Sequence, residues 1–89
     1  MGCVPEISRF FGIVIGMRYR EHEPPHFHAD YAGQHAAIEI ATLAVIGGRL
    51  PGRVLGLVVE WAAEHQAELA ADWELARQHL PPKRIAPLG

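Results

Sequence analysis

The spacing of apolar residues changes once along the chain, and this change constrains the fold more than any other feature. Apolar and polar residues alternate over 12–20, 26–31 and 35–41, as they do in strands with one buried face. From residue 50 onward, apolar residues recur every three or four positions, as they do on amphipathic helices. This order predicts an α+β fold, in which a small antiparallel β-meander of three to four strands precedes two helices packed on one sheet face.

The chain is long enough for one domain with one core, and no linker divides it. We therefore expect a single domain over residues 1–89, with strands at about 12–46, helices at about 51–79 and a short basic C-terminal tail. Trp61 and Trp73 lie on the apolar stripes of the helices and are expected to anchor the core. The sheet side that the helices should cover carries Ile13, Ile15, Phe27, Ile38 and Ile40.

The alternation also predicts the registers of two hairpins. A two-residue turn at Gly33–Gln34 makes apolar residues face apolar ones and polar residues face polar ones. The predicted pairs are Phe27 with Ile40, Ala29 with Ile38, and His28 with Glu39. A first hairpin, closed across residues 21–25, places Tyr19 beside Phe27 and Arg18 beside His28. Residues 43–46 are expected to add a short edge strand before a turn at Gly47–Gly48.

Charge and cysteine content exclude several classes of protein. The net charge is −2 with neutral histidines, so no basic field covering the whole molecule attracts nucleic acid. Cys3 is the only cysteine, so a disulfide framework within the chain is excluded and a reducing cytoplasm is the expected location. We expect neither a signal peptide at the start nor a membrane span, because the apolar stretches are too short.

One polar face of the predicted sheet is the candidate functional site. Its residues are Arg18, Arg20, His26, His28, Asp30 and Glu39. Charged sheet faces are commonly only solvated, but this one combines two guanidinium groups, two imidazoles and two carboxylates on neighbouring strands. Without a metal, the arginines would neutralise a phosphate and a histidine would transfer a proton, with a carboxylate orienting the imidazole. This chemistry suits cleavage of a phosphodiester or recognition of RNA.

A metal site is the alternative interpretation of the same segment. His22, His26 and His28 have the spacing H-x3-H-x-H, and a His-x-His pair on a strand projects both rings to one side. Zinc is the metal that this set would bind, with Asp30 or Glu39 as a fourth ligand or an outer partner. The adjacent arginines oppose a dication.

The remaining histidines have plainer interpretations. His65 lies on an apolar helical stripe and is expected to be packed or to cap a helix. His35, next to a turn, and His79, at a helix end, are expected to be exposed.

Three segments together resemble a known family. ISRFFGIVI, H-x-PPHFHADY and the helical stretch LVVEWAAEHQAEL–DWELA resemble the bacterial domain-of-unknown-function family 4160 over about residues 5–87. The turn YAGQHA differs in detail from the family pattern. The resemblance implies a small bacterial protein, encoded beside a partner of domain-of-unknown-function family 2442 in a toxin–antitoxin-like operon. It assigns no catalytic residue, so its matching positions, among them His22, Pro24 and Pro25, are motif positions only.

Three hypotheses for the function follow. The first is a toxin-like component of a two-gene operon that acts on RNA or translation through the polar sheet face. The second is a non-enzymatic interaction module that binds the protein encoded by the adjacent gene, with the 43–46 edge accepting a partner strand, or that forms a homo-oligomer. The third is a small histidine-rich metal-binding domain.

Overall fold

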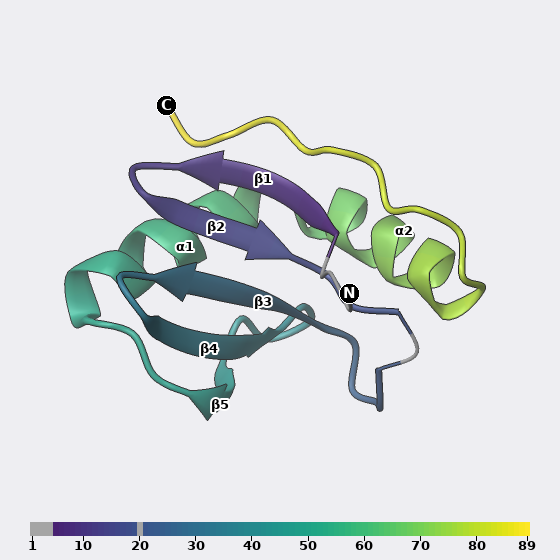
Figure 1. Ribbon diagram of the computed structural model, residues 1–89, viewed down its shortest axis with the longest axis horizontal. Coiled ribbons are helices and arrows are strands. Elements are labelled where there is room, and N and C mark those ends of the chain that lie inside the picture. Colours follow the sequence, from purple (N-terminus) through teal and green to yellow (C-terminus); the bar gives the residue numbers. More distant parts are fainter. Residues whose placement is uncertain (1–4, 20) are drawn as a thin grey trace.

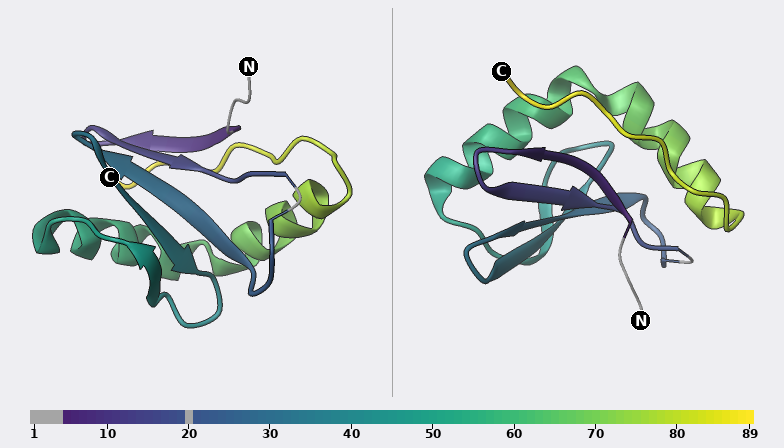
Figure 2. Two further views of the ribbon diagram at one scale, coloured as in Figure 1. Left: turned by 60° about the horizontal axis from the view of Figure 1, so that its bottom comes forward. Right: turned by 45° about the horizontal axis from the view of Figure 1, so that its top comes forward.

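The computed structural model describes residues 5–19 and 21–89, so Cys3 and Arg20 lie outside the described residues. One antiparallel sheet contains β1 (Glu6–Phe10), β2 (Ile13–Gly16), β3 (His26–Tyr31), β4 (Gln34–Glu39) and β5 (Val45–Gly48), in chain order. Helices α1 (Gly52–Glu64) and α2 (Gln66–Arg77) follow, and both lie on one side of the sheet (Figures 1 and 2). The predicted α+β fold is confirmed, with five strands in place of three to four.

The additional strand is β1, which pairs with β2 through a turn at Phe11–Gly12. Apolar and polar residues do not match buried and exposed positions in this segment, because Ser8 is buried and Phe11 is exposed. The pairing with β2 shifts between Glu6 and Ser8, and such a bulge changes which side of the strand each side chain occupies. A period of two therefore cannot be recognised over these residues.

Both predicted hairpin registers are wrong by two residues. Phe27 lies opposite Ile38 rather than Ile40, and His28 lies opposite Ala37 on one side and Gly16 on the other. The β3–β4 turn is at Ala32–Gly33, where both residues have positive φ (48° and 82°), as hairpin turns of two residues require. A shift of two leaves every side chain on its predicted face, because side chains alternate with period two.

The structure also shows where the edge strand and the boundary between the two helices lie. β5 covers Val45–Gly48, so Gly47 and Gly48 are paired with β4 and do not form the predicted turn. The helices are separated at His65, whose ring packs 5.4 Å from the ring of Trp61 and bonds to Glu68. His65 is therefore packed at a helix junction, as predicted.

The core lies between the sheet and the helices. The five sheet residues predicted to be covered are all buried, and so are both tryptophans. Further buried members come from β1, from both helices and from the connections, among them Ile7, Met17, Val58, Leu69 and Ala76, whereas β5 contributes none. Among the described residues, no helix is both long and apolar enough to cross a membrane.

The C-terminal segment is an anchored strap. It runs back from α2 past β1, as the yellow trace in Figure 1 shows. The N–H of Ile85 donates to the carbonyl of Ile7 (2.7 Å), and the indole N–H of Trp61 donates to the carbonyl of Ala86 (2.8 Å). The N–H of Lys83 donates to the carboxylate of Asp72 (2.9 Å). Through these three hydrogen bonds, the C-terminal segment connects both helices to the edge strand β1.

Candidate functional site

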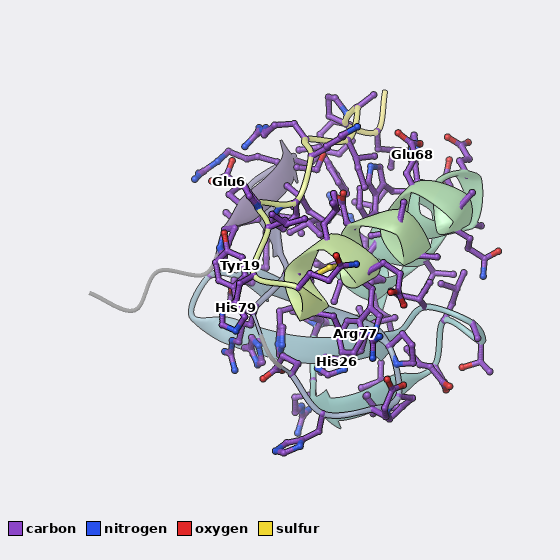
Figure 3. The ribbon with its side chains drawn as sticks, turned by 90° about the vertical axis from the view of Figure 1, so that its right-hand side faces the viewer. Glu6, Tyr19, His26, Glu68, Arg77 and His79 are labelled. Carbon is purple, nitrogen blue, oxygen red and sulfur yellow. The ribbon has the colours of Figure 1, made fainter. Side chains whose placement is uncertain are left out.

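The start of β3 places two imidazoles on the sheet side opposite to Phe27 and Ala29. His26 and His28 are only 7% and 5% exposed, although this side of the sheet was expected to be solvated. His26 lies close to helix α2 (Figure 3), and its ring packs 5.3 Å from the indole of Trp73. The rings of His26 and His28 meet edge to face at 5.0 Å. The two rings are thus held in fixed orientations rather than free in solvent.

Glu21 joins the two histidines. One oxygen of its carboxylate, Oε1, lies 2.8 Å from Nε2 of His26 and 2.9 Å from Nε2 of His28. Glu21 comes from the connection between β2 and β3, where Tyr19 stacks on His79 (Figure 3) at a centroid distance of 5.9 Å. This stacking holds the connection against the end of α2, beside the histidines.

The other nitrogen of each ring is also bonded. Nδ1 of His26 donates to the carbonyl of Pro24 (2.8 Å), since a carbonyl can only accept. Nδ1 of His28 lies 2.8 Å from Nε2 of His35, which projects from β4, and these two rings stack at 5.0 Å. We call Glu21, His26, His28 and His35 the histidine cluster.

The electrostatics of the histidine cluster keep one carboxylate ionised and one imidazole neutral. Burial lowers the pKa of His28; the hydrogen bond with Glu21 acts to raise it, but burial together with the positive charge of Arg18 outweighs that bond. Burial acts to raise the pKa of Glu21, but the hydrogen bonds with His28 and His26 outweigh it and bring that pKa below its usual value. At neutral pH, His28 therefore has one nitrogen lone pair to offer, and Glu21 carries a negative charge.

The structure brings together only some of the predicted site residues. His26 and His28 are in the histidine cluster, while Arg18 is exposed beside it and Asp30 is exposed further along β3. Glu39 lies opposite His26 in the sheet and accepts a hydrogen bond from Thr42 instead (2.8 Å). His22 is exposed, and the described residues that gather as a potential metal-binding group are Glu21, His26 and His28 without it.

Sequence reasoning missed two members of the histidine cluster. Glu21 was assigned only to a connection, because nothing in the local pattern shows that this segment folds back onto the histidines. His35 was expected to be exposed, and it is half-buried. The corrected β3–β4 register could have identified it, since it pairs His35 with Asp30, diagonally adjacent to His28 on the same sheet face.

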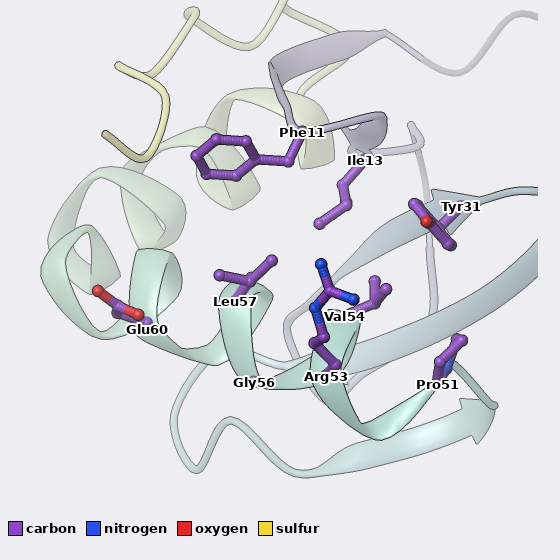
Figure 4. A pocket seen from close by; sticks show the side chains of 9 residues that line it. All are labelled: Phe11, Ile13, Tyr31, Pro51, Arg53, Val54, Gly56, Leu57 and Glu60. Carbon is purple, nitrogen blue, oxygen red and sulfur yellow. The ribbon is translucent and has the colours of Figure 1, made fainter.

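A second feature is an open groove at the opposite end of β3. It has a volume of about 720 Å³ and lies between the β1–β2 turn and α1 (Figure 4). Its walls are mainly apolar, with Phe11, Ile13, Tyr31 and Leu57 accompanied by Arg53 and Glu60. The groove contains no histidine and does not share residues with the histidine cluster.

A five-stranded antiparallel sheet, two helices on one side of it and a histidine–carboxylate cluster around β3 define the chain as a small α+β protein. The chain matches the family described as Domain of unknown function (DUF4160) over residues 12–74, and it belongs to this family. The matched segment includes the whole histidine cluster and nearly all of both helices. No curated protein and no solved structure matches the chain.

Proposed function

We propose that the histidine cluster and Arg18 act on the phosphodiester backbone of RNA, and that the protein is a toxin-like component of a two-gene operon that impairs translation. The observation that carries this proposal is the hydrogen-bonded row Glu21–His28–His35. It starts at the half-buried carboxylate of Glu21 and ends at a half-buried imidazole, and the exposed guanidinium of Arg18 lies beside it.

The row has a consistent set of hydrogen positions. When Nε2–H of His28 donates to Glu21, Nδ1 of His28 accepts from Nε2–H of His35. The lone pair of His35 then resides on Nδ1, for which the described residues supply no hydrogen-bond donor. A carboxylate that orients one imidazole behind another is the kind of support that positions a general base in enzymes.

RNA suits this arrangement better than DNA. Nδ1 of His35 would take the proton of a ribose 2′-hydroxyl, the oxygen would attack the adjacent phosphorus, and the bond to the 5′-oxygen of the next nucleotide would break as that oxygen gains a proton from water. DNA has no 2′-hydroxyl to activate. Arg18 would bind the phosphate and stabilise the negative charge that develops on it.

Controlled expression in a bacterial host tests this proposal. Wild type is expected to arrest growth, and the Arg18→Ala/His35→Gln variant is expected to permit it. The matched control is Arg53→Ala, which removes an exposed arginine on α1 and should leave the arrest unchanged. Purified wild type should cleave RNA about 10²–10⁴-fold faster than His35→Gln. Equal growth for all three proteins, with intact RNA, would contradict the proposal.

A second candidate function is binding of the protein encoded by the adjacent gene. It is supported by β5, an edge strand whose side chains Val45 and Ile46 are 39% and 45% exposed. An edge strand with apolar side chains can accept a strand from a partner. Coexpression should give a complex that Ile46→Lys disrupts and Leu80→Lys, at an exposed residue beyond α2, does not. If both variants bind like wild type, the edge is not the interface.

A further inference from the structure

The hydrogen bonds of His26 present a conflict that a proton or a cation must resolve. Its Nδ1 carries a hydrogen, because it donates to the carbonyl of Pro24. A neutral imidazole has only one N–H, so Nε2 then presents a lone pair. That lone pair points at a carboxylate oxygen of Glu21 only 2.8 Å away. Two acceptors at this distance repel each other unless something positive lies between them.

We propose that a divalent transition-metal ion, zinc in the first place, binds between Nε2 of His26, Nε2 of His28 and the carboxylate of Glu21. The ligand atoms of these three residues all lie within 4.8 Å of one another. Two histidines and one carboxylate form a ligand set that zinc accepts, and they leave a fourth position for water or a substrate. This site differs from the set His22, His26 and His28 that the sequence predicted, because Glu21 takes the place of His22.

The outer partners of both rings support this assignment. A metal-binding histidine generally donates its second N–H to a carbonyl, carboxylate or other acceptor, which fixes the ring and its tautomer. His26 has this partner in the carbonyl of Pro24. His28 has it in Nε2 of His35, provided that Nδ1 of His28 carries the hydrogen. Both Nε2 lone pairs are then directed at the same point, where the carboxylate of Glu21 also lies.

Metal binding requires Glu21 to move away from the two rings. Bonds of 2.0–2.2 Å to a tetrahedral zinc place ligand atoms about 3.3 Å apart, as an order-of-magnitude guide. The distances from Glu21 to the two imidazole nitrogens are 2.8 and 2.9 Å, so its side chain must retreat by roughly half an ångström. Glu21 can do so because it belongs to a connection and its side chain is 24% exposed. The ring of His26 packs against Trp73, and the ring of His28 bonds to His35, so both rings are supported from outside the site.

Neighbouring charges both favour and oppose a bound dication at this site. The carboxylate of Glu21 offsets one positive charge of the ion, whereas Arg18 opposes it. Arg18→Ala is therefore expected to bind the metal more tightly than wild type. The same variant is expected to lose activity on RNA, so the metal site and the proposed function respond to it in opposite directions.

The experiment is metal binding by the full untagged chain, without RNA. The protein is stripped with a chelator, loaded with Zn²⁺ and desalted, and wild type should retain about one ion per chain. Glu21→Gln should reduce the affinity at least tenfold, whereas His22→Ala, the neighbouring exposed histidine, should leave it unchanged. His35→Ala removes an outer partner and should weaken binding about 10–100-fold. Thermal unfolding of each variant, measured without metal, shows that its fold is intact.

A spectroscopic measurement locates the ion. Bound Co²⁺ should give the visible absorption of a tetrahedral site and quench the fluorescence of Trp73, which lies against His26. Wild type that retains no Zn²⁺, or equal affinity in Glu21→Gln and wild type, would overturn the proposal. If His22→Ala loses the metal and Glu21→Gln keeps it, the proposal is overturned in favour of the ligand set predicted from sequence. Growth arrest plays no part in these outcomes, so either proposal can fail while the other stands.

Discussion

Gly48→Ala is the substitution for which the structure predicts the largest effect from a single methyl group. Gly48 lies in β5 with φ of +67°, and a Cβ atom there would be 2.1 Å from the backbone oxygen of His35. An L-residue in this backbone region costs roughly 1–2 kcal/mol, and inserting an atom into a closed contact costs about 1–3 kcal/mol. The free energy of unfolding should therefore fall by roughly 2–5 kcal/mol, with the lower end reached if β5 detaches from the sheet.

The assay is chemical and thermal unfolding of Gly48→Ala beside Gly47→Ala. The neighbouring substitution places its Cβ 3.8 Å from that of Ala37, an ordinary contact, so Gly47→Ala should be neutral or slightly stabilising. For a domain of this size, a loss of about 2 kcal/mol lowers Tm by roughly 8–16 °C. Because the clash is with His35, Gly48→Ala should also weaken metal binding. Equal stability of the two variants would show that β5 is not paired with β4 in this register.

The remaining predictions concern the strap, one buried carboxyl group and one surface residue. Burial raises the pKa of Asp72, whose second carboxylate oxygen has no hydrogen-bond partner among the described residues. The free energy of unfolding of wild type should therefore fall as pH rises through the raised pKa of Asp72, because the folded protein then has to bury the charged carboxylate. Asp72→Asn keeps an acceptor for Lys83 and removes the charge; urea unfolding should show it equal to wild type near pH 3 and more stable by about 1 kcal/mol near pH 7. Trp61→Phe leaves the carbonyl of Ala86 without its donor and should cost about 1–3 kcal/mol, measured by urea unfolding, with faster proteolysis of the C-terminal segment. Phe11→Ser, at an exposed turn, should change stability by less than about 0.5 kcal/mol in the same urea titration, and a larger loss would mean that Phe11 is packed.

The proposed metal and the proposed proton transfer use the same histidines in different tautomers. Proton transfer needs the hydrogen of His28 on Nε2, where it bonds to Glu21, and metal binding needs it on Nδ1, where it bonds to His35. A bound ion would thus reverse the hydrogen bond between His28 and His35 and place a hydrogen on the outer nitrogen of His35. We expect excess Zn²⁺ to inhibit RNA cleavage that depends on His35 as a base.

The sequence alone determined the α+β class, the order of strands before helices and the two faces of the sheet. The physical reason is that the period of apolar residues reports burial locally, and burial of one face is the strongest constraint on each element. This is why Phe27 and Ile38 were correctly assigned to the core, and His26 and His28 to the other side. The same logic placed Trp61 and Trp73 in the core, because each occupies the apolar stripe of a helix.

Tertiary structure decided the register, the strand β1, the strap and the composition of the histidine cluster. A shift of two residues changes every cross-strand neighbour without moving any side chain to the other face, so periodicity could not distinguish Ala37 from Glu39 as the partner of His28. Glu21 joins the histidines because the connection folds back beside α2, and that path depends on contacts between residues far apart in sequence. Local patterns specify which side chains are buried, and only the packed chain specifies which of them meet.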